Sequence, residues 1–240
     1  MPTTTYVSGG KLGDFIQQLA VVYDRFLVDK EPAIVYISDR GDQFRFGVQK
    51  AYEDLLPIVS KQPYIKEFKI HQDEPYDVDL SSWRRLTVCE PLHDYVTWMK
   101  QEYDIDWGKE QWIFYIPIDP NWKDKIVINT THYRFPDTFS WQDYFSRTDP
   151  NKLIFVGFED KDYEDFVRRA GFQISFFKPD SFYDFCIIIN SCELFVGSLS
   201  APLSFAFAVH APVKIGYFVQ NSYDAHIFRN IGQHIPTVRE

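Results

Sequence analysis

The sequence predicts an α/β protein with two Rossmann-like domains, each with a parallel sheet facing a ligand-binding cleft. Three observations indicate this fold class. Strand-like and helix-like segments alternate along the 240 residues, the alternation falls into two halves, and Pro117 and Pro120 bracket a polar turn between them. The expected domains are residues 1–120 and 121–240, with the seam inside residues 116–125.

The N-terminal half begins with a short strand, residues 4–9, and a helix over residues 12–26. Phe15, Leu19, Val22 and Phe26 recur with the helical period and predict one buried face of that helix. The remaining segments are expected in this order: a strand at 32–38, a helix at 44–62 that Pro57 can kink, a strand at 64–70 and a helix at 91–103.

The C-terminal half shows the alternation more clearly. Gly171 ends one charged helix, as glycine commonly does. Strands are expected at 125–131, 152–157, 172–177, 192–197 and 213–218, and helices at 139–147, 160–171, 181–191 and 200–210.

Composition excludes some functions. The formal net charge of −9 argues against a broad surface that grips nucleic acid through its phosphates. The basic clusters at Arg84–Arg85, Lys123–Lys125 and Arg168–Arg169 are short and are interpreted as solvated surface. An aromatic content of 18% predicts a core built on rings, with some tyrosines and tryptophans free to line a cleft.

The three cysteines have no metal-ligand spacing, and Cys186 and Cys192 lie in a segment expected to be buried. A reducing compartment without disulfides fits this pattern. The chain starts without the features of a signal peptide and has no apolar stretch of 18 residues. We therefore expect a cytoplasmic protein without a transmembrane segment.

Three glycines, Gly9, Gly10 and Gly13, lie between the first strand and the first helix. A strand, a glycine turn and a helix N-terminus form a common anion-binding arrangement, because free N–H groups and the helix dipole point outward there. The stretch matches neither the dinucleotide-binding nor the P-loop motif, and a plain turn explains it equally well. The carboxylate of Asp14, at the start of the helix, favours a ligand-binding site here, although it could instead cap the helix.

Two stretches resemble a known family. "SGGKLGDFIQQLAVV" is similar to the N-terminal signature of the heptosyltransferase-like glycosyltransferases of family 9, and "CELFVGSLSAPLSFAFAVHAPVKIGYF" to their second signature. The two stretches lie about 180 residues apart, in the expected halves of a GT-B fold, and cover about 40 residues. The resemblance therefore implies a compact, divergent GT-B glycosyltransferase.

The resemblance assigns roles residue by residue. Asp14 matches the carboxylate regarded as the general base toward the acceptor hydroxyl, and it can take the proton late, as bond formation acidifies that hydroxyl. Gly9, Gly10, Lys11 and Gly13 form the loop expected to approach the acceptor and the phosphates.

The implied donor site lies in the C-terminal half. Backbone amides at the start of the second signature's helix would hold the diphosphate. The residues assigned to donor binding are Thr130, Thr131, Arg134, Gly197, Ser198, Ser200, Ala201 and Pro202, and His132 could assist. Two positions depart from the family, because Leu199 stands where Asp is usual and Ser204 where His is frequent.

The implied function is an inverting, metal-independent glycosyltransferase. It would use a nucleotide-diphosphate sugar as co-substrate, without another cofactor, and an acceptor glycan, lipid-linked sugar or other hydroxyl. The D-x-D strings at 77–79 and 104–106 lie outside the pattern of metal-dependent GT-A enzymes. Two alternatives stay open: a non-catalytic sugar-nucleotide-binding protein, which Leu199 favours, and a viral-type transferase acting on DNA bases, which the net charge opposes.

Overall fold

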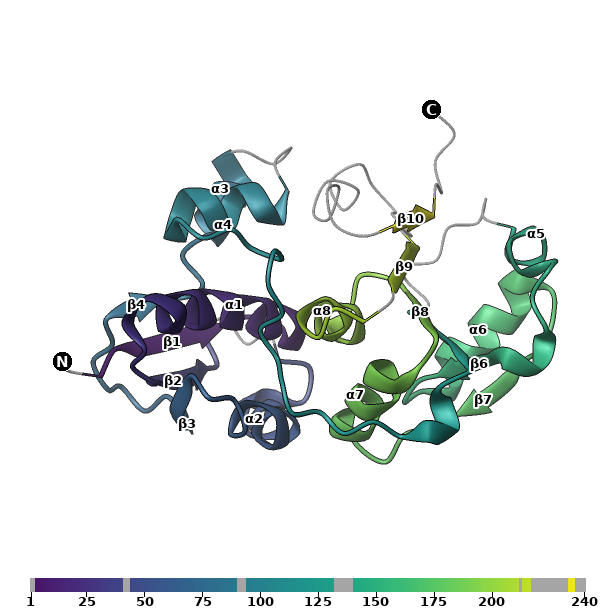
Figure 1. Cartoon of the computed structure of the whole chain (residues 1–240), viewed down its shortest axis with the longest axis horizontal. Coiled ribbons are helices and arrows are strands. Elements are labelled where there is room, and N and C mark those ends of the chain that lie inside the picture. Colours follow the sequence, from purple (N-terminus) through teal and green to yellow (C-terminus); the bar gives the residue numbers. More distant parts are fainter. Residues whose placement is uncertain are drawn as a thin grey trace. The chain divides into compact units, whose positions relative to one another are not determined.

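The chain divides into two units, Met1–Ile116 and Pro117–Glu240, in a computed structural model (Figure 1). The structure describes residues 3–40, 44–89, 94–131, 140–211, 213–216 and 233–235. Each unit carries its own parallel sheet with helices packed against it.

The sheet of the first unit has the strand order β3-β2-β1-β4 among the described residues, and every pairing is parallel. Its strands are β1 (Thr5–Gly9), β2 (Ala33–Ser38), β3 (Ile65–Ile70) and β4 (Val78–Asp79). The first three were predicted from their apolar segments. The two-residue strand β4 was not, because so short a segment has no detectable period.

The helices of this unit are α1 (Leu12–Asp29), α2 (Gly47–Val59), α3 (Arg84–Cys89) and α4 (Tyr95–Tyr103). Phe15 of α1 and Tyr52 of α2 both contact the ring of Phe68 in β3, which puts the two helices on the same face of the sheet. Pro57 lies inside α2 as expected, whereas the sequence does not predict α3.

Two tryptophans of the segment after α4 hold α1 in place. The indole Nε1 of Trp107 donates to the carbonyl of Gln17 (3.1 Å), and that of Trp112 to the carbonyl of Ile16 (2.9 Å). Both indoles are buried, so these hydrogen bonds fix the helix that begins at the glycine turn.

The sheet of the second unit has the order β10-β9-β8-β5-β6-β7, again with parallel pairing throughout. Its strands are β5 (Ile126–Asn129), β6 (Leu153–Val156), β7 (Ser175–Phe177), β8 (Leu194–Gly197), β9 (Val213–Gly216) and β10 (Gln233–Ile235). The first five were predicted. The sequence does not predict β10, which extends this sheet beside β9.

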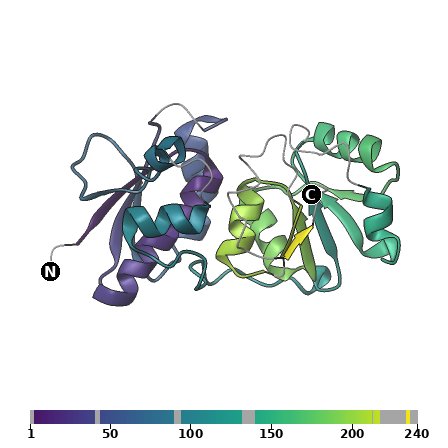
Figure 2. The ribbon, with the colours of Figure 1, turned by 90° about the horizontal axis from the view of Figure 1, so that it is seen from above.

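The helices of the second unit cover both faces of its sheet, α5 and α6 on one and α7 and α8 on the other (Figure 2). They are α5 (Trp141–Phe145), α6 (Asp160–Ala170), α7 (Phe182–Ser191) and α8 (Ala201–Ala208), with 3₁₀ turns η1 (Pro120–Trp122) and η2 (Pro150–Lys152). Gly171 ends α6 with a φ of +75°, as predicted.

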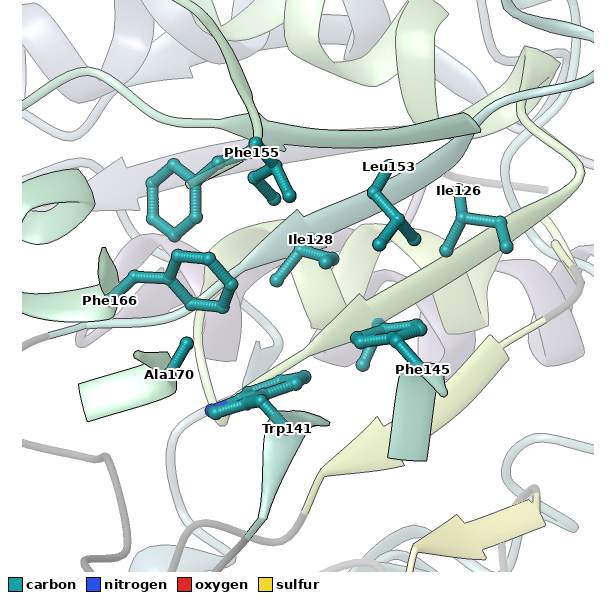
Figure 3. Packing of buried hydrophobic residues seen from close by; sticks show 10 residues of the cluster. Ile126, Ile128, Trp141, Phe145, Leu153, Phe155, Phe166 and Ala170 are labelled. Atoms are coloured by element: carbon teal, nitrogen blue, oxygen red, sulfur yellow. The ribbon is translucent and has the colours of Figure 1, made fainter. Parts of the chain in front are cut away.

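Aromatic rings fill both cores, which confirms the prediction from composition. The largest fully buried side chains are all aromatic: Trp98, Trp112, Trp141, Tyr64, Tyr95, Phe15, Phe155, Phe166, Phe185, Phe195 and Phe205. In Figure 3, Phe155 and Phe166 pack beside Ile128, and Trp141 stacks on Phe145 with centroids 5.7 Å apart. This cluster joins α5 and α6 to the sheet.

Cys186 and Cys192 are buried, as expected. Of the helices in the described part of the chain, none has the length and apolar character needed to cross a membrane.

Candidate functional site

The glycine turn of the first unit stands at the carboxyl end of β1. Gly9 ends the strand, Gly10 turns the backbone with a φ of +110°, and Lys11 is the N-cap of α1, whose first turn contains Gly13. A Cβ on Gly10 would lie 2.0 Å from Arg84 Nη2. Gly10 is therefore required both by its backbone conformation and by a side chain that lies against it.

Asp14 occupies the third position of α1, where it caps the helix and pairs with Arg84. Its Oδ2 accepts from the backbone N–H of Lys11 (3.2 Å), which caps the helix, and from Arg84 Nη2 (2.6 Å). Oδ1 has no hydrogen-bond partner among the described residues. The side chain as a whole is 26% exposed, and one of its oxygens is anchored by both donors.

Arg84 corrects the interpretation of Arg84–Arg85 as solvated surface. Its side chain is only 30% exposed, pairs with Asp14 and lies with Cζ 5.2 Å from the ring centre of Trp83. Arg85 does fit the surface interpretation, since it is 71% exposed and pairs with Glu102. Seventy residues separate Arg84 from Asp14, so no local pattern could have joined them.

Ser81 was also missed, and it ties the β1 turn to the segment after β4. Its hydroxyl accepts from the N–H of Gly9 (2.8 Å) and lies 3.1 Å from the Gly9 carbonyl, to which it can donate. Its own N–H donates to Asp79 Oδ1 (2.8 Å), and Arg40 pairs with Asp79 Oδ2 (3.0 Å). The carboxyl ends of β1, β2 and β4 are thereby joined by side-chain hydrogen bonds.

The carboxylates of the two D-x-D strings already have partners. Asp77 accepts from the N–H of Thr5, Asp79 pairs with Arg40, and Asp104 and Asp106 pair with Lys100. No cluster of three His, Cys, Asp or Glu side chains suited to a metal occurs in the parts of the chain that the structure describes.

Tyr95 lies close enough to Asp14 to respond to its charge. Burial is the main cause that raises the pKa of Tyr95 well above its usual value, and the negative charge of Asp14 raises it further. The phenol is therefore neutral at physiological pH and is no proton acceptor. The carboxylate of Asp14, unlike this phenol, has the chemistry of a proton acceptor.

The candidate donor residues of the second unit meet at the carboxyl ends of β5 and β8. The N–H of Ser198 donates to the carbonyl of Asn129 (3.1 Å), and the Ser198 hydroxyl accepts from the N–H of Thr131 (3.3 Å). Thr130 and Ser198 are almost fully buried. The hydroxyl of Thr131 is also buried and has no hydrogen-bond partner among the described residues.

Ser200, Ala201 and Pro202 begin α8. Ser200 is the N-cap residue, but its hydroxyl donates to the carbonyl of Ser198 (2.9 Å) and makes no cap hydrogen bond to the first turn. The N-terminus of α8 therefore lacks a side-chain cap and keeps the polarity that suits an anion.

Two further positions of this site are buried. Leu199 is 5% exposed and Ser204 3% exposed, and the Ser204 hydroxyl donates to the carbonyl of Ser200 (3.2 Å). The apolar side chain of Leu199 thus stands where the resembled family has a carboxylate. Arg134 and His132 lie outside the described residues.

The structure thus brings the predicted residues together as two sets, each at the carboxyl edge of its own sheet. Ligands of parallel α/β folds bind at this edge. In the first unit, Arg84 and Ser81 join the predicted glycine turn and Asp14. In the second unit, hydrogen bonds connect the loop after β5 to the loop before α8.

Several glycosyltransferases of known structure resemble this chain in fold. A family 9 glycosyl transferase from Veillonella parvula DSM 2008 matches with a TM-score of 0.53 at 13% identity, over 97% of this chain and 86% of that one. E. coli heptosyltransferase WaaC with ADP-2-deoxy-2-fluoro heptose matches with a TM-score of 0.56 at 9% identity, over 88% of each chain. E. coli ADP-heptose lps heptosyltransferase II matches with a TM-score of 0.53 at 13% identity, over 90% of this chain and 85% of that one.

These likenesses confirm the predicted GT-B-like α/β fold and, at the level of fold, the resemblance to family 9 that the two sequence stretches indicated. No protein-family model matches the sequence. No curated protein matches it either.

Proposed function

We propose that the protein is an inverting glycosyltransferase that transfers a sugar from a nucleotide-diphosphate sugar to an acceptor hydroxyl. The observation that carries the proposal is Asp14, a carboxylate next to the carboxyl end of β1, with one oxygen anchored and the other without a hydrogen bond from the described residues. The shared fold supports it, since two similar structures are heptosyltransferases and one of them is a structure with ADP-2-deoxy-2-fluoro heptose.

The reaction follows from these groups. The acceptor oxygen forms a bond to the anomeric carbon of the sugar, and the bond from that carbon to the diphosphate breaks, with its electron pair leaving on the nucleotide diphosphate. The acceptor proton passes to Asp14 Oδ1. A single displacement of this kind inverts the anomeric configuration.

The second unit is assigned to the donor. The unpartnered hydroxyl of Thr131 and the uncapped start of α8 suit the growing charge on the leaving diphosphate. We assign the first unit to the acceptor, and we propose no metal or other cofactor, because the D-x-D carboxylates are engaged in the pairs described above. We also propose a cytoplasmic location, with which two buried cysteines that form no disulfide within the described part of the chain, Cys186 and Cys192, are in keeping.

A thermal-shift screen tests the donor assignment. The protein is heated with UDP-, GDP-, ADP-, dTDP- and CMP-linked sugars and with the free nucleotides, and a ligand that binds the folded state raises the melting temperature by mass action. We expect one nucleotide family to give a shift. Transfer to a candidate acceptor is then followed by release of the nucleotide, and the anomeric configuration of the product is assigned by NMR.

The buried Leu199 favours a second candidate function, a sugar-nucleotide-binding protein without catalysis. A clear thermal shift without turnover for any acceptor would support it. Hydrolysis of the donor that depends on added DNA would support the DNA-base transferase instead. No shift with any nucleotide sugar would contradict all three.

A further inference from the structure

We propose that Arg84 is the positioning residue for Asp14: it anchors one carboxylate oxygen and so orients the other, Oδ1 in this structure, to take the acceptor proton. The inference rests on the proposed function and assigns a role to a residue outside both sequence stretches that resemble family 9.

The hydrogen bonds make the two oxygens of Asp14 unequal. Arg84 Nη2 and the N–H of Lys11 both donate to Oδ2, at 2.6 and 3.2 Å, from two separate elements of the unit. The two oxygens of an ionised carboxylate are chemically equivalent, so these donors fix the orientation of the carboxylate plane, with one oxygen anchored and the other left without a hydrogen-bond partner among the described residues. A base must meet its proton at about 2.6–3.2 Å, which makes this orientation important.

Arg84 is itself held in place. Its guanidinium lies over Trp83, which is buried, stacks on Trp98 with ring centres 5.8 Å apart and contacts Tyr95 at 4.9 Å. Its backbone N–H donates to the carbonyl of Ser81 (3.2 Å), the same residue whose side chain binds Gly9. A cation on a fixed aromatic surface loses little entropy when it pairs with a carboxylate.

Gly10 provides the space that this arrangement needs. A Cβ there would lie 2.0 Å from Nη2 and 2.8 Å from Cζ of Arg84, so the guanidinium stands directly against the turn. A residue with a side chain at position 10, directly before the N-cap residue Lys11, would push Arg84 away from Asp14. The Arg84–Asp14 pair therefore needs a glycine at this position.

The test compares Arg84→Gln, Arg84→Lys and the matched control Arg85→Gln. Arg85 is the adjacent arginine of α3, pairs with Glu102 and is 71% exposed, so its replacement removes the same charge away from Asp14. The readouts are kcat and the acceptor KM for transfer from the donor that the thermal-shift screen identifies. We expect Arg84→Gln to lower kcat about 100-fold with the acceptor KM within about 2-fold, because a misplaced base loses about this much rate. Arg84→Lys should recover part of that loss.

Equal kcat values for Arg84→Gln and Arg85→Gln would overturn the proposal. A rise in acceptor KM with unchanged kcat would also overturn it, because Arg84 would then bind the acceptor instead of orienting the base. Melting temperatures separate a folding defect from a kinetic one.

A second measurement does not depend on turnover. Melting temperatures of Asp14→Asn, Arg84→Gln and the double variant form a double-mutant cycle, and we expect the double variant to lose less than the sum of the single losses. Additive losses would show that the pair does not form in solution. This result would overturn the inference about Arg84 but leave the proposed function standing. Absence of transfer by the unaltered protein, with coupling in the cycle, would instead contradict the proposed function and withdraw the catalytic role of the pair.

Discussion

The ring of Phe195 occupies the space that a side chain on Gly197 would need, since an added Cβ would lie 2.4 Å from Phe195 Cε1. The same Phe-Val-Gly spacing recurs at the end of β6, where a Cβ on Gly157 would lie 3.1 Å from the ring of Phe155. Gly197, which the resemblance assigns to donor binding, therefore has a packing role at the end of β8.

Gly197→Ala should destabilise the protein by about 1–3 kcal/mol, because the Phe195 ring is fully buried and has little room to move. Urea unfolding measures the loss. Gly157→Ala is the matched control. It should lose less free energy of unfolding, because its Cβ would lie farther from the ring of Phe155. If both substitutions cost the same, the close contact at Phe195 does not decide the identity of residue 197.

Asp14→Asn should lower kcat about 10²- to 10⁴-fold, the range that a general base contributes, while donor binding stays nearly unchanged. Transfer kinetics and the donor-induced thermal shift measure the two effects. Asp29→Asn, at the exposed far end of α1, removes the same charge and should leave both unchanged. Turnover at the unaltered rate in Asp14→Asn would rule out the assignment of the base.

Gly10→Ala should reduce both stability and transfer. Alanine at a φ of +110° is strained by about 1–3 kcal/mol, and its Cβ would displace the Arg84 guanidinium from Asp14. Gly9→Ala is the neighbouring control, because its Cβ would meet Ser81 Oγ at an ordinary 3.4 Å. The melting temperatures of the two variants should differ clearly, and a similar loss of stability in both would contradict the role given to Gly10. The transfer rate of Gly10→Ala is compared with that of the unaltered protein.

Thr131→Val tests the donor site of the second unit. The substitution keeps the shape of the side chain and removes a hydroxyl that has no partner among the described residues, so stability should be retained. The loss of one hydrogen bond to a charged phosphate, about 1.5–3 kcal/mol, should raise the Kd of the nucleotide roughly 10- to 100-fold. Calorimetric titration measures the Kd, with Thr131→Ser as the control that keeps the hydroxyl. Unchanged affinity in Thr131→Val would remove Thr131 from the donor site.

The Cys192 thiol links stability to pH. Burial raises its pKa to about 12 from the ordinary 9.0, so the unfolded chain releases this proton at lower pH than the folded protein does. The contribution of this thiol to the free energy of unfolding is fully present below pH 9. It falls as the pH rises toward 12, by up to about 1.4 kcal/mol per pH unit.

Alkylation provides the direct measurement for Cys192. At pH 8 iodoacetamide should label it only after unfolding in urea, as followed by peptide mass spectrometry. Rapid labelling in the folded protein would contradict the burial of this thiol.

The sequence predicted most of the fold because the apolar segments are regular. Of the ten strands in the described parts of the chain, eight were expected close to their observed ranges, namely β1, β2, β3, β5, β6, β7, β8 and β9. The missed elements β4, α3 and β10 are only two to six residues long, and elements of this length lack a period. Their positions depend on the sheet or helices that they join.

The sequence alone determined the alternation of strands and helices, the aromatic core, the glycine turn and the carboxylate at Asp14, because these depend on residue types and spacing within short windows. Only the tertiary structure decided that Arg84 meets Asp14, that Ser81 binds Gly9 and that Phe195 limits residue 197. The first two contacts join residues 70 and 72 positions apart, and the third depends on the direction of a buried ring. A parallel sheet collects the ends of strands that are distant in sequence at one edge, and the site is formed there.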